Sequence, residues 1–282
     1  MEIKKVGVIG AGQMGAGIAQ VCASIGKVVT LCDIKQEFID NGISTITKNL
    51  HRSLSKERIT QKDMDMILGN VSTTLDNEKL GDCDIIIEAI VEDVGIKKKL
   101  FSDLGNVCKE STILASNTSS IPIGILAEVS GRSDKVVGMH FMNPVPVMKL
   151  VEVIRAKSTS DDTFVTTFKL AEDLHKVPVL VNDFPGFVSN RILLPMLNEA
   201  MFCVMEGVAE PEAVDTVMKL GMSHPMGPLT LADFIGLDTC LAIMKVLHKD
   251  MKDDKYRPCP LLEEMVSKGK FGRKSGEGFY KY

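Results

Sequence analysis

One glycine-rich segment limits the possible folds more than any other part of this 282-residue sequence. The run Gly10-Ala11-Gly12-Gln13-Met14-Gly15 directly follows the apolar stretch from Val6 to Ile9. After it come four apolar residues at the spacing of one helix face, namely Ile18, Val21, Cys22 and Ile25. The apolar run from Val28 to Asp33 then predicts a strand covered on both faces. The order of strand, glycine turn, helix and strand is that of a βαβ unit.

Each glycine of this turn has a physical reason. Gly10 permits the tight turn, Gly12 lets the backbone approach a pyrophosphate, and Gly15 allows the helix to pack closely on the strand. Gln13 and Met14 stand where the free N–H groups and the dipole of the helix favour an anion. A G-x-G-x-x-G run alone is also found in ordinary turns, but its place between a strand and a helix predicts a dinucleotide site.

Asp33 ends the second strand, about 20 residues after the glycine turn. A carboxylate at this position accepts hydrogen bonds from the adenosine ribose hydroxyls and repels a 2′-phosphate. We therefore expect NAD as the cofactor. NADP stays possible because Lys35 lies close by in the sequence.

The remaining apolar runs predict an α/β fold class with a Rossmann-type, mostly parallel sheet. Strands are expected at residues 84–89, 112–116, 136–140, 150–154 and 178–181. Between the second and third of the expected strands, helical periodicity over Ile39–Leu54 and around Asp63–Leu68 predicts a helical insertion.

The turn residues around Asp183 and Gly186 predict a domain boundary, with an NAD-binding domain at 1–183 and a second domain at 184–282. The second domain is expected to be all helical. Its predicted helices cover residues 188–206, 211–220, 229–247 and 261–268.

Composition excludes several classes of function. A net charge of −4 gives no global attraction for nucleic acid or for an anionic membrane, and no apolar stretch has the length of a membrane span. The seven cysteines contain no C-x-x-C pair, so we expect reduced thiols and no metal. The first strand begins a few residues after Met1, which predicts a cytoplasmic protein without a signal peptide, although a processed organellar form would look the same.

Among the five histidines, His140 has the most informative position. It ends the predicted strand 136–140, and the carboxyl ends of strands hold the ligands of open α/β sheets. Oxidation of an alcohol by NAD requires a base for the hydroxyl proton, and an imidazole suits that task near neutral pH. An ordinary turn histidine is the alternative.

Glu152 lies among aliphatic residues in the next predicted strand. A charged side chain there needs a partner, and His140 is one that it would orient. Alternatively, Glu152 faces solvent from an edge strand.

Two further polar positions have both local and functional interpretations. The loop Ser116–Ser120 holds small polar residues that stabilise turns or that bind the nicotinamide ribose and the reacting oxygen. Asn190 begins the first helix of the second domain, as a cap or as a contact to substrate and histidine.

Several spaced segments of the sequence resemble one known family. They are GAGQMGAGIAQ, the Asp33 strand, DIIIEAIVED, ILASNTSS, GMHFMNPVPVMKLVEVI, PGFVSNRIL, HPMGPLTLADFIGLD and GRKSGEGFY. They cover nearly the whole chain, which resembles the L-3-hydroxyacyl-CoA dehydrogenases and, within them, the bacterial 3-hydroxybutyryl-CoA enzymes.

The resemblance implies reversible hydride transfer between NAD and a short-chain (S)-3-hydroxyacyl-CoA. It assigns the general base to His140 and its orienting partner to Glu152. It also implies that Ser119 and Asn190 hold the substrate oxygen, and that the helical domain forms a homodimer. The cofactor site that it implies includes Glu92, Lys97, Asn117, Ser119, Asn143 and Lys274.

A basic patch is a candidate for the phosphates of coenzyme A. Lys48, Arg52 and Lys56 follow at intervals of four residues, which predicts one helical face, with Arg58 nearby. We expect Lys56 and Arg52 to bind the phosphates, although a solvated charged face has the same pattern.

Two other functions share part of these features. A dehydrogenase of free hydroxy acids or sugar acids on the same scaffold differs only in its substrate. A dinucleotide-binding sensor or structural protein keeps the fold without catalysis, but the joint presence of His140, Glu152, Ser119 and Asn190 argues against it.

Overall fold

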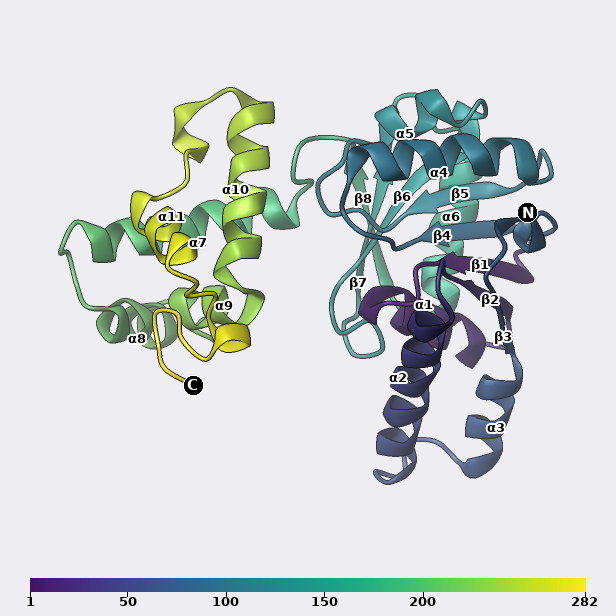
Figure 1. Cartoon of the computed structure of the whole chain (residues 1–282), viewed down its shortest axis with the longest axis horizontal. Helices are drawn as coiled ribbons and strands as arrows, with labels where there is room; N and C mark the ends of the chain where they lie inside the picture. Colours follow the sequence, from purple (N-terminus) through teal and green to yellow (C-terminus); the bar gives the residue numbers. More distant parts are fainter. The chain divides into compact units, whose positions relative to one another are not determined.

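The computed structural model describes all 282 residues, and they divide into two compact units, Met1–Asp183 and Phe184–Tyr282. In Figure 1 the first unit has a twisted sheet with helices on both faces, whereas the second has helices alone. This arrangement confirms the α/β fold class expected from the apolar runs.

The sheet of the first unit has eight strands in the order β3-β2-β1-β4-β5-β6-β7-β8. All neighbouring pairs are parallel except β6 and β7, which are antiparallel. The strands are β1 (Lys5–Ile9), β2 (Val28–Cys32), β3 (Val71–Thr74), β4 (Ile85–Glu88), β5 (Ile113–Ser116), β6 (Val136–Phe141), β7 (Leu150–Arg155) and β8 (Val177–Asn182).

Successive residues along the strands supply two apolar layers. Val8, Ile87 and Val137 belong to the layer that also contains Ile18 of α1 and Leu170 of α6. On the opposite face, Gly138 lies against Ile123 of α5, since a Cβ at Gly138 would come within 3.0 Å of its side chain. The helices of this unit are α1 (Gln13–Ser24), α2 (Gln36–Leu54), α3 (Gln61–Gly69), α4 (Val94–Val107), α5 (Ile123–Val129) and α6 (Asp161–Asp173), with 3-10 helices at Asn77–Leu80 and Ser133–Lys135.

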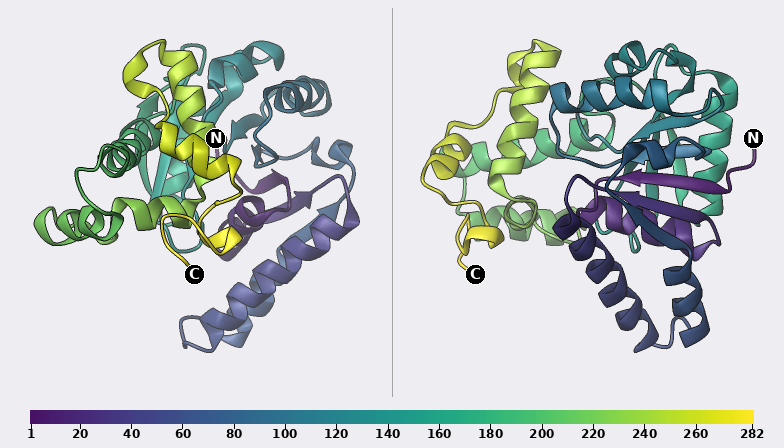
Figure 2. Two further views of the ribbon diagram at one scale, coloured as in Figure 1. Left: turned by 60° about the vertical axis from the view of Figure 1, so that its left-hand side comes forward. Right: turned by 45° about the vertical axis from the view of Figure 1, so that its right-hand side comes forward.

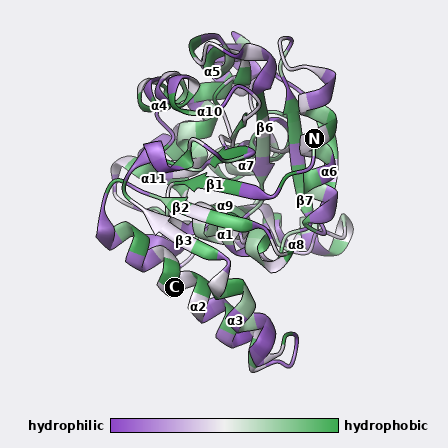
Figure 3. Cartoon of the chain, turned by 90° about the vertical axis from the view of Figure 1, so that its right-hand side faces the viewer, coloured by the Kyte–Doolittle hydropathy of each residue, from purple (hydrophilic) through white to green (hydrophobic).

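The predicted helical insertion forms a pair, α2 and α3, that projects beyond the sheet (Figures 1 and 2). Both helices alternate between hydrophobic and hydrophilic residues along their length in Figure 3. A capping box starts α3: the Thr60 hydroxyl accepts from the Asp63 N–H, and the Asp63 side chain accepts from the Thr60 N–H. Since α2 ends at Leu54, Lys56 lies in the following turn, and its predicted place on one helical face with Lys48 and Arg52 was wrong.

Two elements differ from the expectation. Strand β3, Val71-Ser72-Thr73-Thr74, was not predicted, because its polar residues lie at the sheet edge and lack an apolar run. In addition, the stretch 229–247 forms two helices rather than one. Gly236 separates them with a φ of 104°, a backbone conformation that favours glycine.

The second unit contains α7 (Ser189–Met205), α8 (Pro211–Gly221), α9 (Pro228–Ile235), α10 (Leu237–Met251) and α11 (Pro260–Ser267), with 3-10 helices at Asp254–Tyr256 and Arg273–Ser275. Its core includes Leu197, Met201, Leu229, Met244 and Leu262. Three buried methionines of this core, Met201, Met244 and Met265, therefore fill helix contacts. Across both units, no helix combines the length and apolar character that a membrane span needs.

Candidate active site

The carboxyl ends of the strands bring most of the predicted residues of the first unit to one edge of the sheet, except Arg52 and Lys56. The glycine turn follows β1, and Asp33 follows β2. The 117–120 turn follows β5, which ends at Ser116, while His140 is the next-to-last residue of β6. Segments that are far apart in the sequence thus contribute to one site.

The glycine turn leaves space where an anion would bind. A Cβ on Gly10 would lie 2.5 Å from the Ala89 carbonyl oxygen, and one on Gly15 would lie 1.7 Å from that of Gly10. In contrast, a Cβ on Gly12 would meet nothing within 4 Å. Gly10 and Gly15 are therefore needed for the turn itself, whereas the open side of Gly12 fits the approach of a pyrophosphate to the start of α1.

Asp33 is hydrogen-bonded to the same turn. Its carboxylate accepts the Ala11 N–H at 2.6 Å and the Ile34 N–H at 2.6 Å. Beside it lies a pocket of about 190 Å³ lined mainly by apolar side chains, among them Leu75, Ile90 and Leu100. An apolar pocket with a carboxylate at its rim suits an adenosine, with the adenine ring in the pocket and the ribose hydroxyls at Asp33.

His140 and Glu152 face each other across the antiparallel pair β6 and β7. They are register partners, and the His140 Nδ1 lies 2.7 Å from a Glu152 carboxylate oxygen. Both are largely buried, at 8% and 2% exposure. Because β8 pairs with the other side of β7, Glu152 is not on an edge strand.

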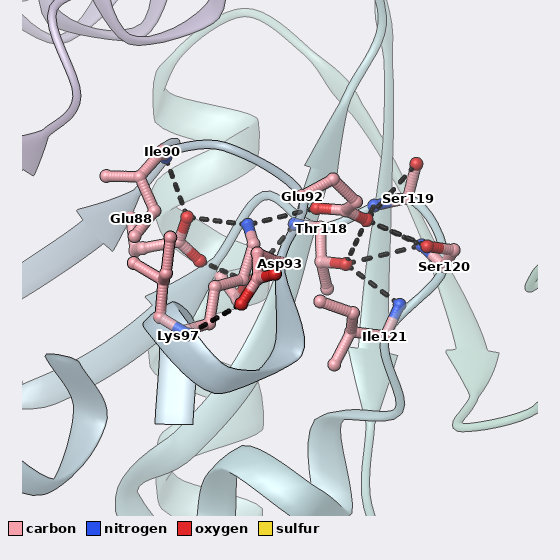
Figure 4. A network of polar contacts seen from close by, with 11 residues as sticks. Glu88, Ile90, Glu92, Asp93, Lys97, Thr118, Ser119, Ser120 and Ile121 are labelled. Atoms are coloured by element: carbon pink, nitrogen blue, oxygen red, sulfur yellow. Dashed lines mark hydrogen bonds and ion pairs between the residues drawn. The ribbon is translucent and has the colours of Figure 1, made fainter. Parts of the chain in front are cut away.

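Glu92 and Lys97 form a polar network with the turn after β5, shown in Figure 4. Lys97, at the first turn of α4, is buried, and its Nζ lies 3.0 Å from the Glu92 carboxylate. The other oxygen of Glu92 accepts from the Thr118 hydroxyl at 2.5 Å and from the Ser119 N–H at 2.9 Å. Burial raises the pKa of Glu92, but Lys97 and these hydrogen bonds outweigh it and hold that pKa below its ordinary value.

Asn117 and Asn143 both have protein partners. The Asn117 side chain accepts the Phe141 N–H at 2.9 Å, which joins the end of β5 to the end of β6. Asn143 accepts from the Gln13 side chain at 2.9 Å and so connects the loop after β6 to the first turn of α1. Both contacts arrange the edge of the sheet where the cofactor is expected.

The other predicted residues lie in separate regions. Asn190 is in the first turn of α7 and is largely buried, and Lys274 forms an ion pair with Asp238. Both belong to the second unit. Arg52 and Lys56 are exposed at the end of α2 and in the turn after it. A cavity of about 450 Å³ inside the helical unit, lined by Asn198, Phe202 and Arg257 among others, contains none of the predicted residues.

One buried residue of the network was missed in the sequence. Glu88 ends β4 and is fully buried, with its carboxylate 2.6 Å from the Lys97 ammonium. The available signal was a charged residue at the end of the apolar run 85–87, since such a charge requires a partner.

Comparison with known proteins extends over the full chain. Residues 5–184 match the family described as "3-hydroxyacyl-CoA dehydrogenase, NAD binding domain", and residues 186–282 match "3-hydroxyacyl-CoA dehydrogenase, C-terminal domain". A protein of Deinococcus radiodurans named "Probable 3-hydroxybutyryl-CoA dehydrogenase" is 62% identical over 99% of this chain and 100% of its own length. The human "Hydroxyacyl-coenzyme A dehydrogenase, mitochondrial" is 42% identical over 99% of this chain and 91% of its own length.

A solved structure agrees in its fold over the same extent. The crystal structure of "(S)-3-hydroxybutyryl-CoA dehydrogenase PaaH1 from Ralstonia eutropha" has a TM-score of 0.97 and 47% identity, covering 100% of this chain and 99% of that one. Two family matches that together span residues 5–282, with relatives of this identity and coverage, lead to one conclusion. This chain belongs to the 3-hydroxyacyl-CoA dehydrogenase family.

Proposed function

We propose that this protein is an NAD-dependent 3-hydroxybutyryl-CoA dehydrogenase that interconverts short-chain (S)-3-hydroxyacyl-CoA and 3-oxoacyl-CoA. The observation that carries the proposal is the buried His140–Glu152 pair at the ligand-binding edge of an NAD-binding domain. The identity of 62% to a relative that bears this name supports the substrate class.

His140 acts as the general base for the substrate hydroxyl. A carboxylate only accepts hydrogen bonds, so the bond to Glu152 keeps the ring hydrogen on Nδ1, and Nε2 is the nitrogen that takes up the proton. As the C3–H bond breaks and the carbonyl forms, the hydroxyl proton moves to Nε2, and Glu152 stabilises the resulting imidazolium. In the reverse direction, the imidazolium returns this proton to the 3-oxo oxygen.

NAD, when bound, supplies the acceptor for the hydride from C3. The open side of Gly12 and the start of α1, with Gln13 and Met14, receive its pyrophosphate, while Asp33 receives the adenosine ribose. Glu92 and Lys97 line the nicotinamide ribose site together with Asn117, Asn143 and Lys274. The Asp33 carboxylate disfavours the 2′-phosphate of NADP.

Two side chains are proposed to hold the reacting oxygen of the substrate. In this proposal, the Ser119 hydroxyl and the Asn190 amide bind the reacting oxygen and steady its charge. Arg52 and Lys56 attract the phosphates of coenzyme A from their exposed positions at the end of α2.

The helical unit is proposed to form a homodimer through α8. Val217 and Leu220, three residues apart on this helix, are 60% and 82% exposed, and Met222 directly after it is 60% exposed. An apolar surface of this kind is typical of an interface between subunits.

A spectrophotometric assay tests the function directly. Acetoacetyl-CoA is supplied with NADH or with NADPH, and free acetoacetate serves as the control substrate. We expect rapid oxidation of NADH with the thioester, a slower reaction with NADPH, and none with the free acid. Equal rates with the free acid would contradict the assigned substrate class.

A further inference from the structure

Glu88 is a buried carboxylate that the mechanism above does not use. It is 0% exposed and ends β4. One oxygen accepts from the Lys97 ammonium at 2.6 Å and the Ile90 N–H at 2.7 Å, while the other accepts from the Ser116 hydroxyl at 2.6 Å. A carboxylate buried away from water requires partners of this kind.

Two routes lead from Glu88 to the turn that carries Ser119, and Figure 4 labels the residues of the first. In the first, Lys97 bridges Glu88 at 2.6 Å to Glu92 at 3.0 Å. Glu92 then accepts the backbone N–H of Ser119 at 2.9 Å and that of Ser120 at 3.1 Å.

The second route passes through the end of β5. The Ser116 hydroxyl donates to Glu88 and accepts the Thr118 N–H at 3.1 Å. Both routes therefore end on the 118–120 turn, from α4 on one side and from β5 on the other.

The charges of the network show why an acid is needed at this position. Lys97 is 1% exposed and lies between two carboxylates, whereas the Glu92 side chain is 37% exposed. Without the charge of Glu88, the buried Lys97 ammonium has Glu92 as its single anionic partner among these residues. Lys97 and the 118–120 turn then compete for the Glu92 carboxylate. A glutamine at position 88 also replaces one of the two carboxylate oxygens with an NH₂ group, so Lys97 and Ser116 can no longer each donate to an oxygen of its own.

We propose that Glu88 is a positioning residue for the dehydrogenase reaction, which acts through Lys97 and Ser116 to fix the turn that places Ser119. The inference rests on the proposed function, in which Ser119 holds the substrate oxygen. Glu88 itself touches neither substrate nor cofactor in this account.

A double-mutant cycle in the full-length protein tests this role. Glu88→Gln is made in the wild-type chain and in Ser119→Ala, and kcat and KM are measured for acetoacetyl-CoA reduction by NADH. In the wild-type background we expect kcat to fall about tenfold to a hundredfold, with KM for the thioester changed less than about threefold. In the Ser119→Ala background the further loss in kcat should be less than about threefold, because the group to be placed is gone.

Thr112→Val is the matched control for the loss of a buried polar group. Thr112 precedes β5, and its hydroxyl donates to the Cys83 carbonyl at 2.7 Å, which has no part in either route. This variant should have a lower melting temperature with unchanged kcat. If Glu88→Gln does not fold, Ser116→Ala takes its place, since it removes only the second route and should lower kcat several-fold in the wild-type background alone.

The outcomes are distinguishable. A wild-type protein without acetoacetyl-CoA reductase activity overturns the proposed function, and the inference with it, before any variant is compared. With an active wild type, an unchanged kcat in Glu88→Gln, or the same fold-loss with and without Ser119, overturns the positioning role alone. Loss confined to the background that retains Ser119 supports it.

Discussion

At the scale of single residues, the orientation of His140 follows from the register of two strands. His140 and Glu152 lie opposite each other on β6 and β7, and strands on both sides hold them in place. The carboxylate therefore needs no loop movement to reach Nδ1. Catalytic groups on paired strands are held more rigidly than groups on loops.

Glu152→Gln tests the orienting role. The amide can present its NH₂ group to Nδ1, which moves the ring hydrogen to Nε2 and removes the lone pair that takes the proton. We expect kcat to fall by about 10² to 10⁴ with an NADH dissociation constant within about twofold of the wild-type value. The matched control is Glu128→Gln, an exposed position on α5, which should leave both constants unchanged.

The glycine turn gives a second prediction at this scale, from a pair of alanine variants. Gly12→Ala should fold like the wild type and bind NADH at least about tenfold more weakly, because its new methyl group occupies the open side of the turn. Gly15→Ala should instead lower the melting temperature, since its Cβ would collide with the Gly10 carbonyl. Thermal unfolding and NADH fluorescence titration separate the two effects. Equal stability in both variants would contradict the described geometry.

At the scale of secondary-structure elements, most of the sheet could be predicted because its strands are continuous apolar runs. The exceptions depend on contacts across the fold. Strand β3 is polar and lies at an edge, and at the break after Gly236 the Leu237 N–H donates to the distant Phe271 carbonyl at 3.2 Å. A local pattern does not contain such contacts.

The candidate site likewise contains residues that a local pattern identifies and one that it does not. The glycine turn, His140 and Glu152 could be identified because their residue types stand at the ends or in the middle of apolar runs. Lys97 could not be chosen on physical grounds, because the sequence KKK at 97–99 looks like a solvated helix face. Its burial against Glu88 arises only from the packing of α4 beside β4 and β5.

Asp84, directly before β4, gives a prediction about the pH dependence of stability. It accepts the N–H groups of Lys4 and Lys5 at 2.8 and 2.9 Å, and the Lys109 ammonium lies 2.7 Å away. Burial raises the pKa of Asp84, but these bonds outweigh it and hold that pKa below its ordinary value. The carboxylate therefore stabilises the fold above its unfolded pKa, and this contribution is lost as the pH falls through the folded value.

Asp84→Asn should thus lower the melting temperature by about 2–5 °C at pH 7, and by progressively less below about pH 4. Thermal unfolding across this range measures the difference from the wild type. A difference that stays constant down to pH 2 would show that charge is not the cause.

At the scale of the whole molecule, α8 of the helical unit presents exposed apolar side chains. Leu220→Lys places a charge at the most exposed apolar position of α8. We expect light scattering coupled to gel filtration to give a dimer for the wild type and a monomer for the variant. A wild-type monomer, or a variant with the mass of the dimer, would contradict the proposed interface.

The central assignment is that of His140 as the base for a hydroxyacyl thioester. Single-turnover oxidation of enzyme-bound NADH by acetoacetyl-CoA, followed in the wild type, His140→Gln and the partly exposed control His248→Gln, measures this step most directly. We expect the rate to fall by at least about 10² in His140→Gln, with NADH binding retained and His248→Gln like the wild type. A His140→Gln protein that transfers hydride at the wild-type rate would contradict the central claim.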